Sequence, residues 1–150
     1  MSQSLSKILI HLVFSTKNRE CFIDNAIAPR LYAYMSGVFI KMESPAVLIG
    51  GTEDHTHSLF VLSKNHAPAR VIKEVKRASS IWMKDQGQPY RRFFWQNGYG
   101  EFSIGESGVP KLKAYILNQK EHHKKITFQD EMRAFYKKYN VKYDERFCWD

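Results

Sequence analysis

The chain has 150 residues and a formal net charge of +8, with 43% hydrophobic and 14% aromatic residues. This length and apolar content predict a single domain over residues 1–150 and exclude a disordered chain. The sequence has no run of the roughly 20 apolar residues needed to cross a bilayer, and its N-terminus lacks the pattern of a signal peptide. We therefore expect a cytoplasmic protein whose positive charge favours a nucleic acid as partner.

Hydrophobic periodicity predicts a strand, a helix and a hairpin in the first half of the chain. Residues 4–15 are rich in Ile, Leu, Val and Phe and indicate a buried strand. Asp24 is suited to cap a helix over about residues 25–41. Residues 46–49 and 55–62 predict two central strands joined by a tight connection.

The second half begins with an amphipathic, basic helix that starts near residues 65–68. Residues 93–95 and 99–104 predict one or two further strands, and a helix is expected from Pro110 to about His123. A last helix follows Thr127. This order predicts an α+β fold, a ferredoxin-like or RRM-like antiparallel sheet with helices on one face and additional C-terminal helices.

Two residue pairs are candidates for catalytic or metal-binding roles. Alternation along a strand places His55 and His57 on one face and Thr56 on the other. Tyr115 and Gln119 are four residues apart, which places them on one face of the predicted helix. Each pair alone is common in proteins without such a site. Together they supply the groups needed for metal-assisted attack on a phosphodiester.

A tyrosine nucleophile suits a reaction that cuts and later rejoins a strand. The covalent phosphotyrosine keeps the energy of the broken bond, so no ATP is required, and the sequence has no Walker-type phosphate loop. Because the reference pKa of tyrosine is about 10, a metal ion or a neighbouring base must assist deprotonation of Tyr115.

Three segments in order resemble the TnpA-like single-tyrosine HUH transposases of bacterial insertion sequences, a family that includes the REP-associated tyrosine transposases. The segments are GGTEDHTH at residues 50–57, WQNGYGEFS at residues 95–103 and YILNQKEHH at residues 115–123. The stretch HLVFSTK at residues 11–17 also fits the first strand of that family. The resemblance covers nearly the whole chain.

The resemblance implies a ferredoxin-like, usually dimeric enzyme that cuts and rejoins single-stranded DNA at element ends, which carry hairpins. It forms a 5′-phosphotyrosine and frees a 3′-hydroxyl. By motif matching, Tyr115 is the nucleophile, and His55, His57 and Gln119 hold Mg²⁺ or Mn²⁺. The expected protein is thus a homodimer with no nucleotide cofactor, associated with the nucleoid. One departure is Thr56, because the middle HUH position is normally a bulky hydrophobe and a buried hydroxyl needs a partner.

Further basic residues are candidates for contacts with DNA phosphates. They are Lys73, Lys76, Arg77, Arg91, Arg92, Lys111 and Lys113. His122 and His123 are expected to face solvent at the end of their helix rather than to join the metal site.

Three other functions compete with this interpretation. A domesticated or inactive relative would bind a DNA hairpin without cutting it. A two-histidine RNA phosphoesterase would need a second His-x-Thr/Ser motif, and the sequence offers no convincing one. A membrane-surface protein would need an apolar, basic helix of a kind not found here. The sequence leaves open the hairpin and target, whether the gene is mobile or host-retained, and whether Tyr115 acts in its own subunit or across a dimer.

Overall fold

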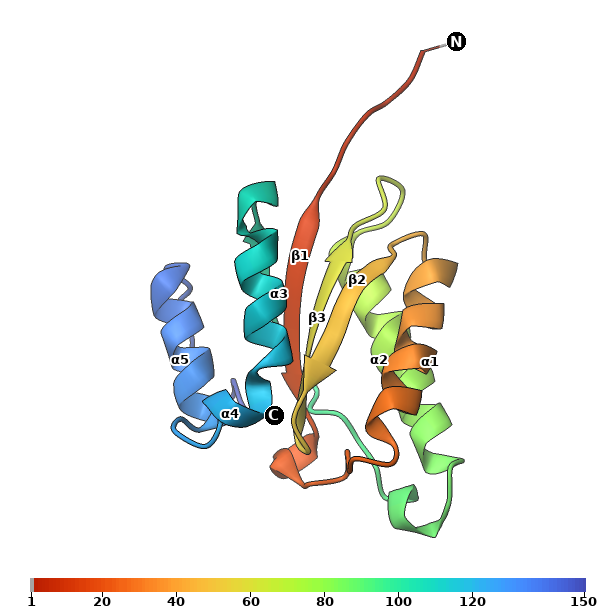
Figure 1. The fold of residues 1–150 in the computed structure, drawn as a ribbon, viewed down its shortest axis with the longest axis vertical. Helices are drawn as coiled ribbons and strands as arrows, with labels where there is room; N and C mark the ends of the chain where they lie inside the picture. Colours follow the sequence, from red (N-terminus) through yellow and green to blue (C-terminus); the bar gives the residue numbers. More distant parts are fainter. Residues whose placement is uncertain (1) are drawn as a thin grey trace.

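The computed structural model describes residues 2–150 and contains a four-stranded antiparallel sheet in the order β2-β3-β1-β4 (Figure 1). The strands are β1 (Leu9–Ser15), β2 (Ala46–Gly51), β3 (His55–Val61) and β4 (Gly100–Ile104). The helices are α1 (Ala28–Lys41), α2 (Pro68–Lys84), α3 (Val109–Leu117), α4 (Gln119–His122) and α5 (Phe128–Lys138). The order β1-α1-β2-β3-α2-β4 confirms the predicted α+β, ferredoxin-like class.

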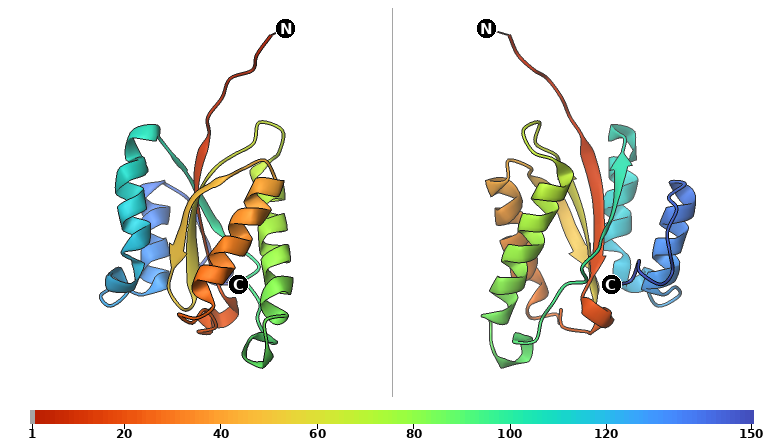
Figure 2. Two further views of the ribbon diagram at one scale, coloured as in Figure 1. Left: turned by 45° about the vertical axis from the view of Figure 1, so that its right-hand side comes forward. Right: turned by 180° about the vertical axis from the view of Figure 1, so that it is seen from behind.

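Helices α1 and α2 cover one face of the sheet (Figure 2). Alternation along β1 directs Ile10, Leu12 and Phe14 to this face, where all three are buried. They pack with Phe60 of β3 and with the apolar stripes of both helices, which include Leu31, Met35, Phe39, Val71, Ile72 and Val75. This is the larger apolar core of the molecule.

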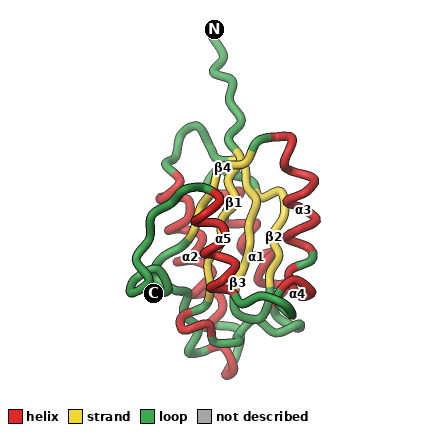
Figure 3. The backbone as a smooth tube through the Cα atoms, turned by 90° about the vertical axis from the view of Figure 1, so that its left-hand side faces the viewer, coloured by secondary structure: helices red, strands yellow, loops and turns green. Residues whose placement is uncertain are grey.

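Helices α3 and α5 lie over the opposite face of the sheet (Figures 1 and 3). The apolar contacts here form two separate clusters, one under each helix. Leu9 and Leu59 pack against Leu112 and Ile116 of α3. The cluster under α5 contains Val13, Phe102, Phe128, Met132 and Tyr136.

Two glycines allow these helices to approach the sheet closely. A Cβ atom at Gly50 would lie 2.9 Å from Ile116 Cγ2 and 3.1 Å from the Ile116 carbonyl oxygen. A Cβ atom at Gly100 would lie 2.5 Å from Met132 Cε. Glycine at position 50 therefore sets the depth of α3, because the contact includes the helix backbone, whereas at Gly100 the flexible end of Met132 can move aside.

Two predicted elements were wrong. Residues 93–95 do not form a strand, because only Trp95 makes a bridge, with Thr16. Phe93 and Trp95 are buried in the core instead, where Trp95 packs against Phe14 with ring centroids 4.6 Å apart, whereas Phe94 is exposed. The single helix expected from Pro110 to His123 is broken at Asn118, whose φ and ψ are −96° and 15°.

The first strand is shorter than predicted. β1 begins at Leu9 because its two partner strands reach no further, ending at Val61 and Ile104 opposite that residue. Asp24 does accept hydrogen bonds from the backbone of Ala26 and Ile27, as expected of a cap, although the regular helix begins at Ala28. Within residues 2–150 no helix has the length and apolar content to span a membrane.

Candidate metal and nucleophile site

The two β3 histidines point between α3 and α5, and neither is exposed to solvent. The Nδ1 atom of His55 lies 2.7 Å from Asp54 Oδ1 and 2.8 Å from Thr52 Oγ1. The Nδ1 atom of His57 lies 2.8 Å from His11 Nε2. With Nδ1 engaged in this way, each imidazole presents Nε2 to the interior of the site, the arrangement that orients histidines as metal ligands.

The electrostatic environment keeps the imidazole pair His11 and His57 neutral. Burial lowers the pKa of His11 to about 3, and the neighbouring His57 adds to this shift. Burial also lowers the pKa of His57. A neutral imidazole is the form that binds a metal ion.

Gln119 begins α4 and is buried beside His55. Its Oε1 atom lies 3.0 Å from His55 Nε2, and its Nε2 atom donates to the Tyr115 carbonyl oxygen at 3.4 Å. The His55 and His57 rings are 5.3 Å apart. The structure thus brings together the three side chains that the sequence named as metal ligands.

Tyr115 lies on α3 with its ring edge-on to His57, at a centroid distance of 5.7 Å. Its hydroxyl donates to Glu131 Oε2 and lies 3.3 Å from His122 Nε2. Burial, followed by the charge of Glu131, raises the pKa of Tyr115 above its ordinary value. The phenol therefore stays protonated until another group assists its ionisation, and it meets the histidines of its own chain.

Glu131 of α5 is a site residue that the sequence analysis missed. Its Oε1 atom lies 3.1 Å from His57 Nε2 and 3.7 Å from His55 Nε2. Burial opposes ionisation, but His123 and His57 outweigh that effect and hold the pKa of this carboxyl well below its usual range. A signal was available, because Glu131 falls in a stripe with Phe128, Met132 and Phe135 at the spacing of a buried helix face.

His11 was missed for a similar reason. It occupies a position in β1 where alternation predicts an apolar residue, between Leu9 and Val13. A buried histidine on such a face requires a polar partner. His57 on the neighbouring strand is that partner.

The prediction for His122 and His123 was wrong, because both rings face the site. The break at Asn118 starts a new helix direction that turns this pair toward α5. His123 Nε2 lies 3.2 Å from Glu131 Oε1, yet it is buried without a hydrogen bond of acceptable geometry. Its contact with Glu131 is therefore a charge contact that lacks the geometry of a hydrogen bond.

One ligand atom from each of His55, His57, His123 and Glu131 lies within 4.8 Å of the other three. Three nitrogens and a carboxylate oxygen, with the Gln119 amide oxygen beside them, form a mixed imidazole and oxygen set suited to a divalent ion. The observation in favour of this fit is the approach of His123 Nε2 to Glu131 Oε1, 3.2 Å apart without hydrogen-bond geometry. Thr56 points to the opposite face, and its buried hydroxyl lacks the hydrogen-bond partner that a buried hydroxyl was expected to need.

Residues 4–119 match the family described as transposase IS200 like. The chain belongs to this transposase family. Its fold is similar to that of a candidate transposase from Deinococcus radiodurans R1, with a TM-score of 0.63 at 22% identity, covering 79% of this chain and 98% of the other. It is also similar to a REP-associated tyrosine transposase bound to a REP hairpin, with a TM-score of 0.61 at 14% identity, covering 100% and 98%. No match was found among curated proteins.

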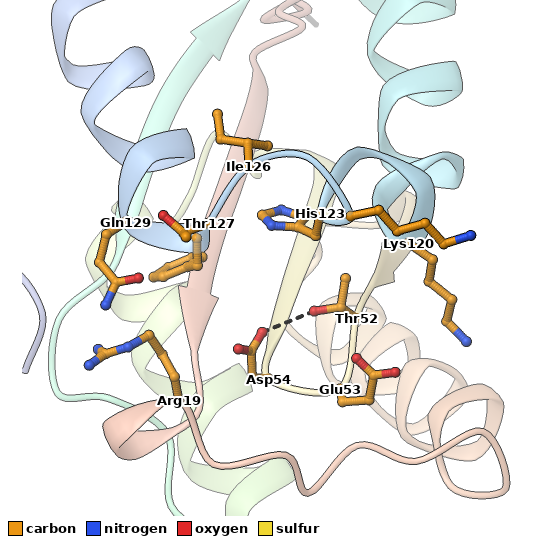
Figure 4. Close-up of a pocket in the computed structure, with 11 residues that line it drawn as sticks. Arg19, Thr52, Glu53, Asp54, Lys120, His123, Ile126, Thr127 and Gln129 are labelled. Atoms are coloured by element: carbon orange, nitrogen blue, oxygen red, sulfur yellow. Dashed lines mark hydrogen bonds between the residues drawn. The ribbon is translucent and has the colours of Figure 1, made fainter.

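A pocket of about 610 Å³ opens beside the histidine cluster of this transposase (Figure 4). His123 forms part of its wall, and Thr52 and Asp54, which hold His55, form another part. The basic residues in the lining are Arg19, Lys120 and Lys124. The lining also includes the acidic Glu53 and Asp54, and His123 is the one residue of the four-residue cluster that reaches this pocket. A separate pocket of about 220 Å³ is lined by Tyr115, His122 and Glu131.

The predicted DNA-binding residues lie on several surfaces of the transposase. Six of the seven are exposed, namely Lys73, Arg77, Arg91, Arg92, Lys111 and Lys113. Lys76 is half-buried, and its ammonium donates to the carbonyl oxygens of Gln96, Asn97 and Gly98. Arg77 pairs with Glu74. Only Lys111 and Lys113 share a helix with Tyr115.

Proposed function

We propose that this IS200-like transposase cleaves and rejoins single-stranded DNA at element ends, with Tyr115 as nucleophile and a divalent cation at His55, His57 and Gln119. The observation that carries the proposal is the link, through one carboxylate, between the nucleophile and the histidines. One buried carboxylate accepts the Tyr115 hydroxyl on Oε2 and contacts His57 Nε2 with Oε1. A tyrosine used only for packing needs no such connection to a set of converging imidazoles.

In the proposed reaction the Tyr115 oxygen forms a bond to phosphorus, and the bond between phosphorus and the 3′-oxygen breaks. The phenolic proton is lost, and the departing 3′-oxygen takes up a proton to become a 3′-hydroxyl. A bound Mg²⁺ or Mn²⁺ would neutralise a non-bridging phosphate oxygen and stabilise the charge of the transition state. The reverse attack by a 3′-hydroxyl on the 5′-phosphotyrosine rejoins the strand.

The substrate we propose is single-stranded DNA that carries a hairpin. The similar REP-associated transposase is bound to a REP hairpin, and the net charge of +8 favours a polyanion. The pocket lined by Tyr115, His122 and Glu131 offers a route by which a flexible strand reaches the nucleophile. The dimer and the cytoplasmic, nucleoid-associated location stay predictions, and one chain already supplies all the groups named above.

The test is formation of a covalent adduct. The protein is incubated with Mn²⁺ and labelled single strands that contain hairpins from the flanks of its own gene, and the products are separated under denaturing conditions. We expect an adduct with wild type and none with Tyr115→Phe. Tyr143→Phe is the matched control, because Tyr143 is exposed and distant in sequence from the site, and it should form the adduct normally.

Failure of this test would favour the second candidate function. If wild type binds these hairpins but forms no adduct with any of them, the protein is a hairpin-binding relative without strand-transfer activity. Binding should also weaken steeply as salt is raised, because phosphate contacts release counterions.

A further inference from the structure

One carboxylate, that of Glu131, lies between the side chains of the site, and its helix lies outside the residues that match the transposase family. Residues 4–119 match the transposase family, whereas Glu131 lies on α5, which spans Phe128–Lys138. Glu131 is 2% exposed. Its Oε1 atom lies between His57 Nε2 at 3.1 Å and His123 Nε2 at 3.2 Å. The proposed function uses Glu131 only as the contact between Tyr115 and His57, and it assigns no metal-ligand role to Glu131 or His123.

We infer that Glu131 and His123 are additional ligands of the divalent cation, and that Glu131 also positions the Tyr115 hydroxyl beside it. This inference rests on the proposed function, because it concerns the same cation site. It extends the ligand set from the three motif residues to two residues that the motifs do not include. It also gives α5 a role in metal binding, because that helix carries Glu131.

The spacing of the atoms supports shared ligation. Divalent ions such as Mg²⁺ bind oxygen at about 2.0–2.1 Å, so adjacent ligand atoms of an octahedron lie about 3 Å apart. The distances from Glu131 Oε1 to His57 Nε2 and to His123 Nε2 agree with that spacing. His55 Nε2, at 3.7 Å, lies slightly further away.

The bonding state of His123 supports the same conclusion. Its Nε2 atom is buried and has no hydrogen bond, although a carboxylate oxygen is within 3.2 Å. A buried polar atom normally has a partner, and one without a partner requires an explanation. A cation bound between His123 and Glu131 provides that explanation, because a metal ligand uses the nitrogen lone pair rather than an N–H bond.

A carboxylate ligand improves the charge balance of the site. The histidines and Gln119 are neutral as ligands, so they do not offset the charge of a buried divalent ion. Glu131 is the one carboxylate in the described four-residue cluster, and Mg²⁺ and Mn²⁺ prefer such oxygen ligands. Its other oxygen, Oε2, accepts the Tyr115 hydroxyl, so the same carboxylate holds the phenol beside the proposed cation site.

The test measures Mn²⁺ binding to DNA-free, full-length protein by electron paramagnetic resonance of the free ion. We expect Glu131→Gln and His123→Ala to raise the Mn²⁺ dissociation constant by roughly ten-fold or more. Asp130→Asn is the matched control, because it removes the same charge from an exposed neighbour on α5 and should change the constant less than about two-fold. Glu131→Asp keeps the charge and should restore part of the affinity.

Thermal melts without Mn²⁺ identify variants that have not folded, and Glu131→Asp provides a second, charge-conserving variant if Glu131→Gln does not fold. Wild-type Mn²⁺ affinity in folded Glu131→Gln would overturn the ligand assignment, even if the Tyr115 adduct still forms. Loss of the adduct in Tyr115→Phe with altered Mn²⁺ affinity in Glu131→Gln supports both proposals. At saturating Mn²⁺, a wild-type rate of adduct formation in Glu131→Gln would overturn the positioning role.

Discussion

The two faces of the sheet differ in what they bury. The face under α1 and α2 buries a continuous apolar core that includes Phe14 and Phe60. The face under α3 and α5 holds two smaller apolar clusters, with buried histidines, a glutamine and a glutamate on the same face. Because burial of apolar area is the main source of stability, we expect the first face to supply most of the stability and the second to supply the chemistry.

The sharpest test of this division uses two residues of one strand. His57 and Phe60 lie on opposite faces of β3, and both have no exposed surface. His57→Ala should reduce adduct formation by about 1,000-fold or more, since it removes a proposed ligand of the cation. Phe60→Ala should lower the free energy of unfolding by about 3–5 kcal/mol while its folded molecules form the adduct at the wild-type rate.

Urea denaturation and single-turnover assays at low temperature separate these two effects. Hairpin binding provides the control for His57→Ala, because phosphate contacts do not depend on the imidazole. Equal loss of binding and adduct formation in His57→Ala would mean that the variant is misfolded and that the two faces are not separable in this way.

Gly50→Ala probes the contact between β2 and the helix that carries Tyr115. The new methyl group would lie 2.9 Å from Ile116 Cγ2 and 3.1 Å from its carbonyl oxygen, so α3 must shift by a few tenths of an ångström. We expect a loss of about 1–3 kcal/mol in stability and a roughly ten-fold slower adduct formation, because the phenol moves with Ile116.

Gly37→Ala is the comparison for that variant. Gly37 lies in α1, and nothing lies within 4 Å of an added Cβ. Gly37→Ala should raise the free energy of unfolding by about 0.5–1 kcal/mol, because alanine has the higher helix propensity, and should leave the rate of adduct formation unchanged. A rate unchanged by Gly50→Ala would show that the site tolerates displacement of α3.

Thr56→Val is expected to change stability slightly and to leave the chemistry unchanged. Thr56 points into the apolar core with a buried hydroxyl that has no partner. Removal of that hydroxyl should stabilise the protein by about 1 kcal/mol, measured as a higher midpoint of urea denaturation. Thr16→Val should do the opposite, because the Thr16 hydroxyl donates to the Glu20 carbonyl oxygen at 2.7 Å.

The sequence predicted the parts of the site that depend on local spacing. His55 and His57 share a face because strands alternate, and Tyr115 and Gln119 come together because they are one helical turn apart. The break at Asn118 did not prevent this, because it falls between these two residues and Gln119 still reaches His55.

The parts that depend on packing between distant elements were not predicted. Glu131 is 74 residues from His57 in the chain, and no local pattern states which face of the sheet α5 covers. The prediction that His123 faces solvent was wrong because it assumed one continuous helix. Helical spacing alone does not predict that a new helix begins after Asn118. Residues 93–95 have the aromatic composition of a strand, but an extended loop that places Phe93 and Trp95 in the core has the same composition.

Helix α5 lies outside the residues that define family membership, although it contributes Glu131 to the site. Two relatives with identical histidine, tyrosine and glutamine motifs can therefore differ at the position of Glu131, and a comparison of motifs would rank them as equal. If the proposed ligand set is correct, the two relatives would differ in their affinity for Mn²⁺. Inherited changes in this one helix would then alter the concentration of metal ion that such an enzyme needs for activity, while its recognisable motifs stay the same.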